Sequence, residues 1–315
     1  MSAAPSLLSR IVRSRTIWIC LIVVALAATL PLYVSGYILG LLTIAYYYGV
    51  FSMAWDLLFG FAGEVNFGPT FLIGLGAYTA GILDNLYQPP IALCIAAGAL
   101  VAVAGGVVLA LPALRVRGPY FGLTTLVAVL MLQNFVVVAA GFTGGEIGLT
   151  VPDVVSIKDG VNYWIALGFM TVSGVVLYGL SRSPVGLILQ ASGQDAIQAG
   201  ALGFNVTKHK LAAFIISAFF SGLAGALLVF YLGAVSVGTF IDVTVGVQVI
   251  IAAVLGGRRT ILGAVLGAVF LIAAGEALRP LGDLSNFIVS AIALVVVLLF
   301  PSGLLGLITR SRETS

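Results

Sequence analysis

Residues that could do chemistry are few in this chain. Only 8% of its 315 residues are Asp, Glu, Lys or Arg, and it has one histidine and two cysteines. His209 lies between two lysines, and neither Cys20 nor Cys94 has a ligand-like spacing to it or to the other. Metal coordination and nucleophilic catalysis both need several such groups together. We therefore expect no metal site and no catalytic residue.

One polar segment breaks an otherwise apolar sequence. Residues 186–206 carry small and amide side chains and include a Leu-Gly pair at Leu202 and Gly203. Strongly apolar sequence resumes a few residues later. A short helix held in water between two apolar segments, and ended by a glycine turn, suits a surface that fits against another protein.

The composition indicates the class of protein. Hydrophobic residues make up 61% of the chain and the mean hydropathy is +1.20, far outside the range of soluble globular domains. A polytopic membrane protein is indicated, with room for roughly ten spans of about 20 residues each. The apolar runs are long and continuous, which favours helices over barrel strands. We expect an all-α transmembrane bundle in which residues 1–315 form one domain.

Apolar runs and the Gly, Pro and charged residues between them predict about ten spans. Their expected limits are about 16–34, 36–59, 63–83, 91–112, 119–141, 161–181, 211–233, 242–256, 260–278 and 285–305. The segment 242–256 is the shortest, at roughly 22 Å of helix, and a re-entrant segment is the alternative there.

The basic residues predict which side of the membrane each connection faces. With the N-terminus inside, only Lys158 and Arg279 of the 14 Lys and Arg residues lie outside. The cytoplasmic set is Arg10, Arg13, Arg15, Arg115, Arg117, Arg182, Lys208, Lys210, Arg258, Arg259, Arg310 and Arg312. Both termini are therefore expected in the cytoplasm of a bacterium, with the chain multi-pass in its inner membrane. This asymmetry favours a full crossing by 242–256, because the basic residues beyond it would otherwise change sides.

The first apolar run has some features of a cleavable signal peptide. Arginines precede it, and Ala25-Leu26-Ala27 lies near its end. The run is long and another span follows almost at once. We therefore expect an uncleaved anchor.

Glycine is abundant, with 39 residues, many of them inside expected spans. Small residues four apart permit close helix contact, and the simplest role for each pair is packing within one bundle. Such rows are Gly36 with Gly40, Gly263 with Gly267, and Ser217, Ser221 and Gly225 beside Ala218, Gly222 and Ala226. The segment 63–69 combines two glycines and a proline with polar residues, and it predicts a helix break against protein or a water-filled path.

Polar groups within or at the mouths of spans are candidates for a path through the membrane, because leaving them in lipid is costly. They are Asn66, Tyr120, Thr124, Thr125, Gln133, Asn134 and Thr143, with Phe67 and Phe121 as neighbours. Gly144 and Gly145 could present N–H groups to a carboxylate, and a flexible loop before Pro152 is the alternative. For the acids near span ends, Asp56, Glu64, Asp242 and Glu276, we expect solvation at the membrane surface rather than proton transfer.

A series of short motifs carries a resemblance that covers nearly the whole chain. They are GEVNFG at 63–68, GLGAYTA at 74–80, RGPYFGLTTL at 117–126, TGGEIGL at 143–149, ALGFNV at 201–206, KLAAF at 210–214, SGLAGA at 221–226 and PSGLLGL at 301–307. In this order they resemble the permease subunits of branched-chain amino-acid ABC importers, and specifically the M-type partner of the H/M pair.

The resemblance implies a set of partners. These are a second homologous permease subunit, two cytoplasmic ATPase subunits that bind ATP and Mg, a periplasmic substrate-binding protein, and membrane lipid. The chain itself would be no enzyme, would bind no cofactor and would contact no nucleic acid. Its substrate would be branched-chain or other hydrophobic amino acids. The residues expected along the substrate path are Asn66, Phe67, Tyr120, Phe121, Thr124, Thr143, Gly144 and Gly145.

The resemblance also implies that residues 183–207 are a cytoplasmic coupling helix region. Its expected ATPase contacts are Gln190, Gln194, Asp195, Ala199, Leu202 and Gly203. Many relatives carry charged residues at the positions of Leu187, Gln190, Gly193 and Gln194, whereas here only Asp195 is charged. The ATPase contact should therefore depend on shape and hydrogen bonds more than on ion pairs.

Two other classes of function stay open at this point. A proton- or ion-coupled secondary transporter would need a buried carboxylate and no ATPase. A passive channel for a small neutral solute such as urea would need neither. Within the resembling family, urea or short amides are the alternative substrates.

Overall fold

A computed structural model describes residues 15–114 and 119–282, together with residues 284, 288 and 291. The expected span at 285–305 lies outside this described part. So do six of the basic residues on which the orientation was based, namely Arg10, Arg13, Arg115, Arg117, Arg310 and Arg312.

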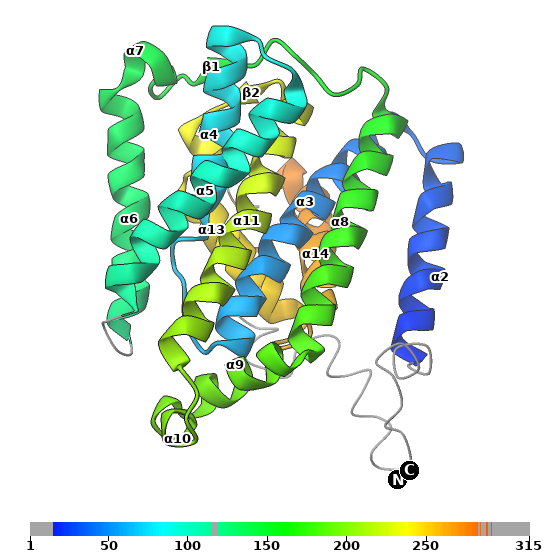
Figure 1. Ribbon diagram of the computed structural model, residues 1–315. Helices are drawn as coiled ribbons and strands as arrows, with labels where there is room; N and C mark the ends of the chain where they lie inside the picture. Colours follow the sequence, from blue (N-terminus) through cyan, green and yellow to red (C-terminus); the bar gives the residue numbers. More distant parts are fainter. Residues whose placement is uncertain (1–14, 115–118, 283, 285–287, 289–290, 292–315) are drawn as a thin grey trace.

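The described chain is a bundle of long helices that run between two ends (Figure 1). The long helices are α2 (Arg15–Thr29), α3 (Gly36–Asp56), α4 (Pro69–Tyr87), α5 (Ile91–Ala113), α6 (Pro119–Val138), α8 (Asp159–Arg182), α11 (Val206–Leu232), α13 (Val243–Gly256) and α14 (Leu262–Leu278). Short elements join them: η1 (Leu30–Leu32), η2 (Leu57–Phe61), α7 (Ala140–Thr143), α9 (Pro184–Gln194), α10 (Ala196–Ala201), α12 (Val237–Phe240) and η3 (Arg279–Leu281). The two strands, β1 (Leu149–Thr150) and β2 (Ala234–Val235), pair antiparallel.

Six helical stretches of the described chain are long and apolar enough to cross a membrane. They are Gly36–Phe61, Ile91–Ala113, Tyr120–Val138, Asp159–Arg182, Val206–Leu232 and Val237–Gly256. Two shorter apolar helices are Ile22–Leu32 and Leu262–Leu278. The structure is therefore a multi-pass helical bundle of the expected class, and the total of about ten spans remains a prediction.

The helix limits differ from the expected spans in instructive ways. The expected span 63–83 is helical only from Pro69, because residues 62–68 form the predicted break. The expected span 211–233 begins earlier, at Val206, so that the lysines before it lie on the first turns of α11. The short segment 242–256 is preceded by α12, and together they give a helical stretch of 20 residues.

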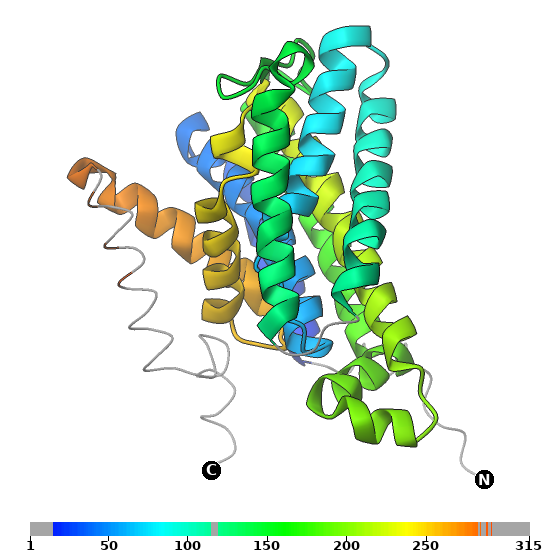
Figure 2. The ribbon, with the colours of Figure 1, turned by 90° about the vertical axis from the view of Figure 1, so that its left-hand side faces the viewer.

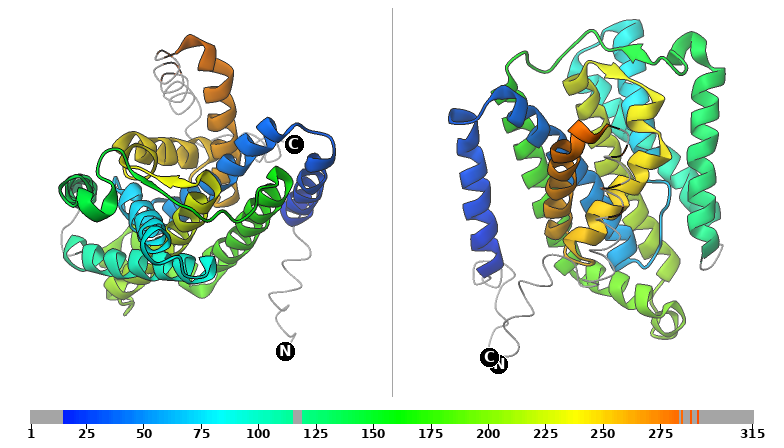
Figure 3. Two further views of the ribbon diagram at one scale, coloured as in Figure 1. Left: turned by 90° about the horizontal axis from the view of Figure 1, so that it is seen from above. Right: turned by 180° about the vertical axis from the view of Figure 1, so that it is seen from behind.

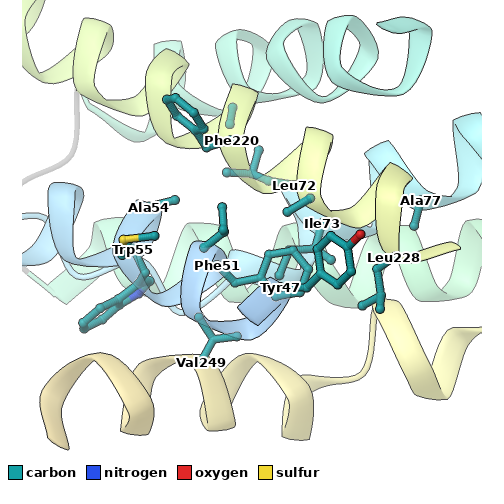
Figure 4. Packing of buried hydrophobic residues seen from close by; sticks show 14 of the residues in the cluster. Tyr47, Phe51, Ala54, Trp55, Leu72, Ile73, Ala77, Phe220, Leu228 and Val249 are labelled. Atoms are coloured by element: carbon teal, nitrogen blue, oxygen red, sulfur yellow. The ribbon is translucent and has the colours of Figure 1, made fainter. Parts of the chain in front are cut away.

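Helix α3 lies at the centre and carries much of the core. It packs against α8, α11, α13 and α14, while α4, α5 and α11 pack against one another. Figure 4 shows Tyr47 and Phe51 of α3 among Leu72 of α4, Leu228 of α11 and Val249 of α13, and all five side chains are buried. By contrast, α6 and α2 stand at opposite edges of the bundle (Figure 3).

Small residues set the contact between α4, α5 and α11. A Cβ at Gly98 would lie 2.6 Å from the carbonyl oxygen of Gly76, and one at Gly225 would lie 2.5 Å from that of Ile73. A Cβ at Gly76 would collide with the backbone of Gly222. The predicted row of small residues on α11 therefore packs within this bundle.

The two ends of the bundle differ in their connections. Helices α9 and α10 lie at one end, which we call the elbow end, and the β1–β2 pair and α7 lie at the other, which we call the hairpin end (Figures 1 and 2). Among described side chains, Arg182, Lys208, Lys210, Arg258 and Arg259 belong to connections at the elbow end. Lys158 directly precedes α8 and Arg279 directly follows α14, both at the hairpin end.

Candidate functional site

The polar segment folds into two short helices, α9 and α10, which are joined at Asp195. Ser183 precedes α9, and its hydroxyl accepts a hydrogen bond from Gly186 N at 3.4 Å, while Pro184 occupies the first helical position. Asp195 caps α10, because its Oδ1 accepts from Ile197 N and Gln198 N, both at 2.9 Å. We call α9 and α10 together the elbow.

A glycine turn ends the elbow and returns the chain to the bundle. Gly203 has φ +88°, a left-handed conformation that glycine adopts without strain. Asn205 then begins α11 by accepting a hydrogen bond from Lys208 N at 3.0 Å. The Leu-Gly turn read from the sequence is therefore present, and it is followed by a capped helix rather than by a loop.

The residues expected to contact the ATPase do not share one face of the elbow. Gln194, Leu202 and Gly203 are exposed, and Gln190 and Asp195 are partly buried. Ala199 is only 2% exposed, so that in this structure it packs inside the elbow and offers no surface to a partner. The sequence identified it as a small residue but not the direction in which it points.

The elbow also has an apolar surface, of which only Leu202 was among the expected ATPase contacts. Leu187, Ile197 and Leu202 are 60%, 76% and 75% exposed, and Phe204 is 40% exposed. We call these four residues the elbow face. A signal was available, since Ile197 is the one large apolar side chain of the six-residue α10, which begins with an Asp cap and has polar or small neighbours.

Three of the acids near span ends, Glu64, Asp242 and Glu276, are hydrogen-bonded to or paired with other groups of the chain. Glu64 Oε1 lies 2.5 Å from Lys210 Nζ, and both side chains are less than 20% exposed. Asp242 begins α13, and its Oδ1 accepts from Thr244 N at 2.6 Å. At the hairpin end, Glu276 accepts from the hydroxyl of Tyr37 and pairs with Arg279 at 3.3 Å.

Asp56 departs furthest from the expected surface position. It is 1% exposed and lies at the end of α3. Its two carboxylate oxygens accept from Arg259 N and Ile261 N, each at 3.0 Å. Arg259 and Ile261 have φ of +64° and +49°, which is unfavourable for residues with a Cβ. Asp56 therefore stabilises the tight connection between α13 and α14.

The residues proposed for a path fall into two groups at opposite ends of α6. In the first, the break at 62–68 lies against the start of α6, where Phe67 N donates to Thr125 Oγ1 at 3.0 Å. Asn66 is 1% exposed, and its side chain accepts from Gly68 N at 2.8 Å. Phe121 is buried as well, whereas Phe67 is 46% exposed.

The second group forms the turn after α6. Thr143 Oγ1 donates to Val136 O at 2.6 Å and accepts from Gly145 N at 3.2 Å. Gly144 N donates to Ala140 O at 3.0 Å. Both glycine N–H groups are therefore used inside this turn, which leaves neither one directed toward a carboxylate in this conformation.

One face of α6 is exposed or half-buried along its whole length. Its members follow a spacing of three and four residues and are Tyr120, Thr124, Val127, Met131, Asn134 and Val138, which we call the α6 face. A shallow groove is lined by Val127, Met131, Asn134 and their apolar neighbours. The amide of Asn134 bonds only to Leu130 O of its own helix, at 2.7 Å, and otherwise faces outward.

The sequence is similar to known permease proteins along most of its length. A family model described as "Branched-chain amino acid transport system / permease component" matches residues 37–300. The chain is 28% identical to the high-affinity branched-chain amino acid transport system permease protein LivM of Salmonella typhimurium, over 96% of this chain and 77% of that protein. It is 26% identical to the permease protein BraD of Pseudomonas aeruginosa, over 84% of this chain and 93% of that protein.

A partial match links the chain to a second kind of permease protein. The chain is 29% identical to LivH of Salmonella typhimurium over 45% of this chain and 46% of that protein. No solved structure matches the chain.

Proposed function

This chain belongs to the family of branched-chain amino acid transport permease components, and from that premise we propose that it forms one transmembrane half of an ATP-driven importer. The observation that carries the proposal is the family match across residues 37–300, which includes the elbow and both path groups. In this reading the chain translocates branched-chain amino acids and hydrolyses no ATP itself. Partner ATPase subunits bind ATP and Mg.

The elbow is the proposed contact with the ATPase subunits. It lies outside the apolar helices, at the end of the bundle where the described basic residues are concentrated. From the positive-inside rule we propose that this end lies in the cytoplasm of a bacterial cell, and that both termini are cytoplasmic as well. The exposed apolar elbow face is suited to a protein groove, since burying its four large apolar side chains against a partner would remove apolar surface from water.

The α6 face is the proposed boundary with the second permease subunit. The amide of Asn134 would be costly to leave in lipid, and a polar path or a partner helix offers it hydrogen-bonding groups, while Tyr120 and Thr124 lie on the same face. The partial similarity to LivH supports a homologous partner for that position. A periplasmic binding protein would deliver substrate at the hairpin end.

The proton-coupled alternative receives less support from the geometry. Asp56, a buried carboxylate at a span end, already accepts two backbone hydrogen bonds, and Glu64 is paired with Lys210. Both groups therefore have a structural role in the conformation described.

Reconstitution tests the proposal. The chain would be placed in proteoliposomes with its second permease, both ATPases and the binding protein, and leucine uptake measured beside uptake of urea and acetamide. We expect leucine uptake that requires ATP and every partner. Uptake driven by a proton gradient without the ATPases would contradict the proposal, and transport of urea in place of leucine would correct its substrate.

A further inference from the structure

The elbow rests on the bundle through direct contact between two backbones. Gly193, in the last turn of α9, faces the end of η2, and a Cβ there would lie 2.6 Å from Phe61 O and 3.0 Å from Gly63 N. In the other direction, a Cβ at Gly63 would lie 2.8 Å from both Cα and O of Gly193. Since no side chain separates the two segments, no flexible group can absorb a displacement of one against the other.

A salt bridge joins the neighbouring residue, Glu64, to the start of α11. Glu64 follows Gly63, and its carboxylate pairs with Lys210 on the first turns of α11, directly after the elbow. The pair is largely shielded from water, so that salt screens its attraction less than that of an exposed pair, and removing one partner would leave a shielded charge unpaired. Residues 63 and 64 are therefore bound to both the end of α9 and the start of α11.

From this contact the chain runs directly into the first path group. Residues 65–67 have no helical hydrogen-bond ladder, and the bonds that place them involve side chains. Phe67 N donates to Thr125 Oγ1, Gly68 N to Asn66 Oδ1, and Trp55 Nε1 to Asn66 O at 2.6 Å. Such bonds can exchange partners during a shift of a few ångström, whereas shifting a helix would move its whole length.

We propose that Gly63 and Gly193 are positioning residues, which form a joint that transmits movement of the elbow to Asn66 and Phe67. The joint rests on the proposed function, because the elbow moves only if ATPase subunits engage it. When the ATPases close, the elbow moves. Because the backbones of Gly193 and Gly63 are in direct contact, this movement displaces residues 62–68. The side chains of Asn66 and Phe67 then change position against the start of α6, and this alters access to the path.

The test uses the assembled importer and the variant Gly193→Ala. An added Cβ would force the elbow away from η2, and we expect the ratio of leucine imported to ATP hydrolysed to fall by a factor of about 2 to 30, the range for residues that carry coupling. Gly179→Ala is the matched control. It makes the same replacement within a long helix, and no atom lies within 4 Å of the added Cβ. We expect its ratio to match that of the unmodified protein.

A second readout separates transmission from a merely structural role. Phe67→Cys, in a chain with Cys20→Ala and Cys94→Ala, would be labelled with a maleimide with and without vanadate-trapped nucleotide. We expect the labelling rate to change on trapping, and Gly193→Ala to abolish that change. If Gly193→Ala fails to assemble, the same measurements would be made on Glu64→Gln. We expect its ratio of leucine imported to ATP hydrolysed to fall as well, but by a smaller factor.

The outcomes distinguish the joint from the proposed function. If the unmodified complex imports leucine without its ATPases, the proposed function fails. If import requires ATP but Gly193→Ala, or Glu64→Gln in its place, keeps the unmodified ratio and the labelling change, the joint is wrong and the proposed function stands.

Discussion

The elbow end and the hairpin end of the bundle are both rich in glycine turns, but they are held together differently. At the hairpin end one turn bonds to itself, as Gly148 N donates to Gly144 O at 3.2 Å, and long-range bonds join the loops around β1 and β2, such as Val151 N to Gly233 O at 2.9 Å. At the elbow end the bonds join elements far apart in sequence, such as Asp56 to Ile261 and Glu64 to Lys210. A force applied at the elbow would therefore reach α3, α11 and the α13–α14 connection, whereas the bonds around β1 and β2 join connecting loops.

The largest expected effect is from Asp56→Ala at the elbow end. The change leaves Arg259 N and Ile261 N buried without their acceptor, in a turn that already contains two unfavourable φ angles. We expect a loss of about 3 kcal/mol, since each unsatisfied buried donor costs about 1 to 3 kcal/mol. Thermal unfolding in detergent would measure it, and Asp56→Asn, which keeps one acceptor, should lose less. An unchanged unfolding temperature for Asp56→Ala would show that this connection does not depend on the carboxylate.

The next largest effect is expected when an exposed isoleucine is replaced by glutamate at the elbow end, and the same replacement at the hairpin end is the comparison. Ile197→Glu places a charge on the elbow face, and we expect the ATPase subunits retained during purification to fall at least about tenfold, because burying an unpaired carboxylate in an apolar contact is costly. Ile147→Glu is the control, as Ile147 is 96% exposed at the hairpin end. Equal retention by both variants would remove the distinction between the ends.

The smallest effect is expected from Gly148→Ala, which should change stability at the hairpin end without changing coupling. Gly148 has φ +87°, and a Cβ there would collide with Val235 O. We expect Gly148→Ala to destabilise the protein by about 1 to 2 kcal/mol through backbone strain and local displacement. The amount of ATP used for each leucine should not change. Gly141→Ala, with no atom within 4 Å of the added Cβ, should be neutral. A change in that ratio for Gly148→Ala would mean that the hairpin end takes part in coupling.

The sequence predicted features that local patterns encode. Composition indicated a multi-pass helical bundle, the two glycines and the proline of 63–69 indicated a break, and the row of small residues around Gly222 indicated close packing. The polar composition of 186–206, together with the Leu202-Gly203 pair, indicated a short helix outside the membrane and its turn. Each of these depends on residues within about one or two helical turns of one another.

Contacts between distant segments could not be predicted in this way. Glu64 and Lys210 are separated by 146 residues, and nothing in either local sequence identifies the other. The Gly63–Gly193 contact is likewise visible only once α9 is placed against η2. Ala199 shows the same limit, because a small residue in a short polar helix fits equally well inside the elbow or on its surface.

The most direct test of the account is whether the elbow touches the ATPase. A single cysteine at position 202, introduced by Leu202→Cys with Cys20→Ala and Cys94→Ala, would be treated with a short bismaleimide in the assembled importer carrying cysteines on the ATPase surface. The account predicts a crosslink to an ATPase subunit from position 202 and none from Ile147→Cys. A crosslink from position 147, or labelling of position 202 from the outer side of intact cells, would contradict it.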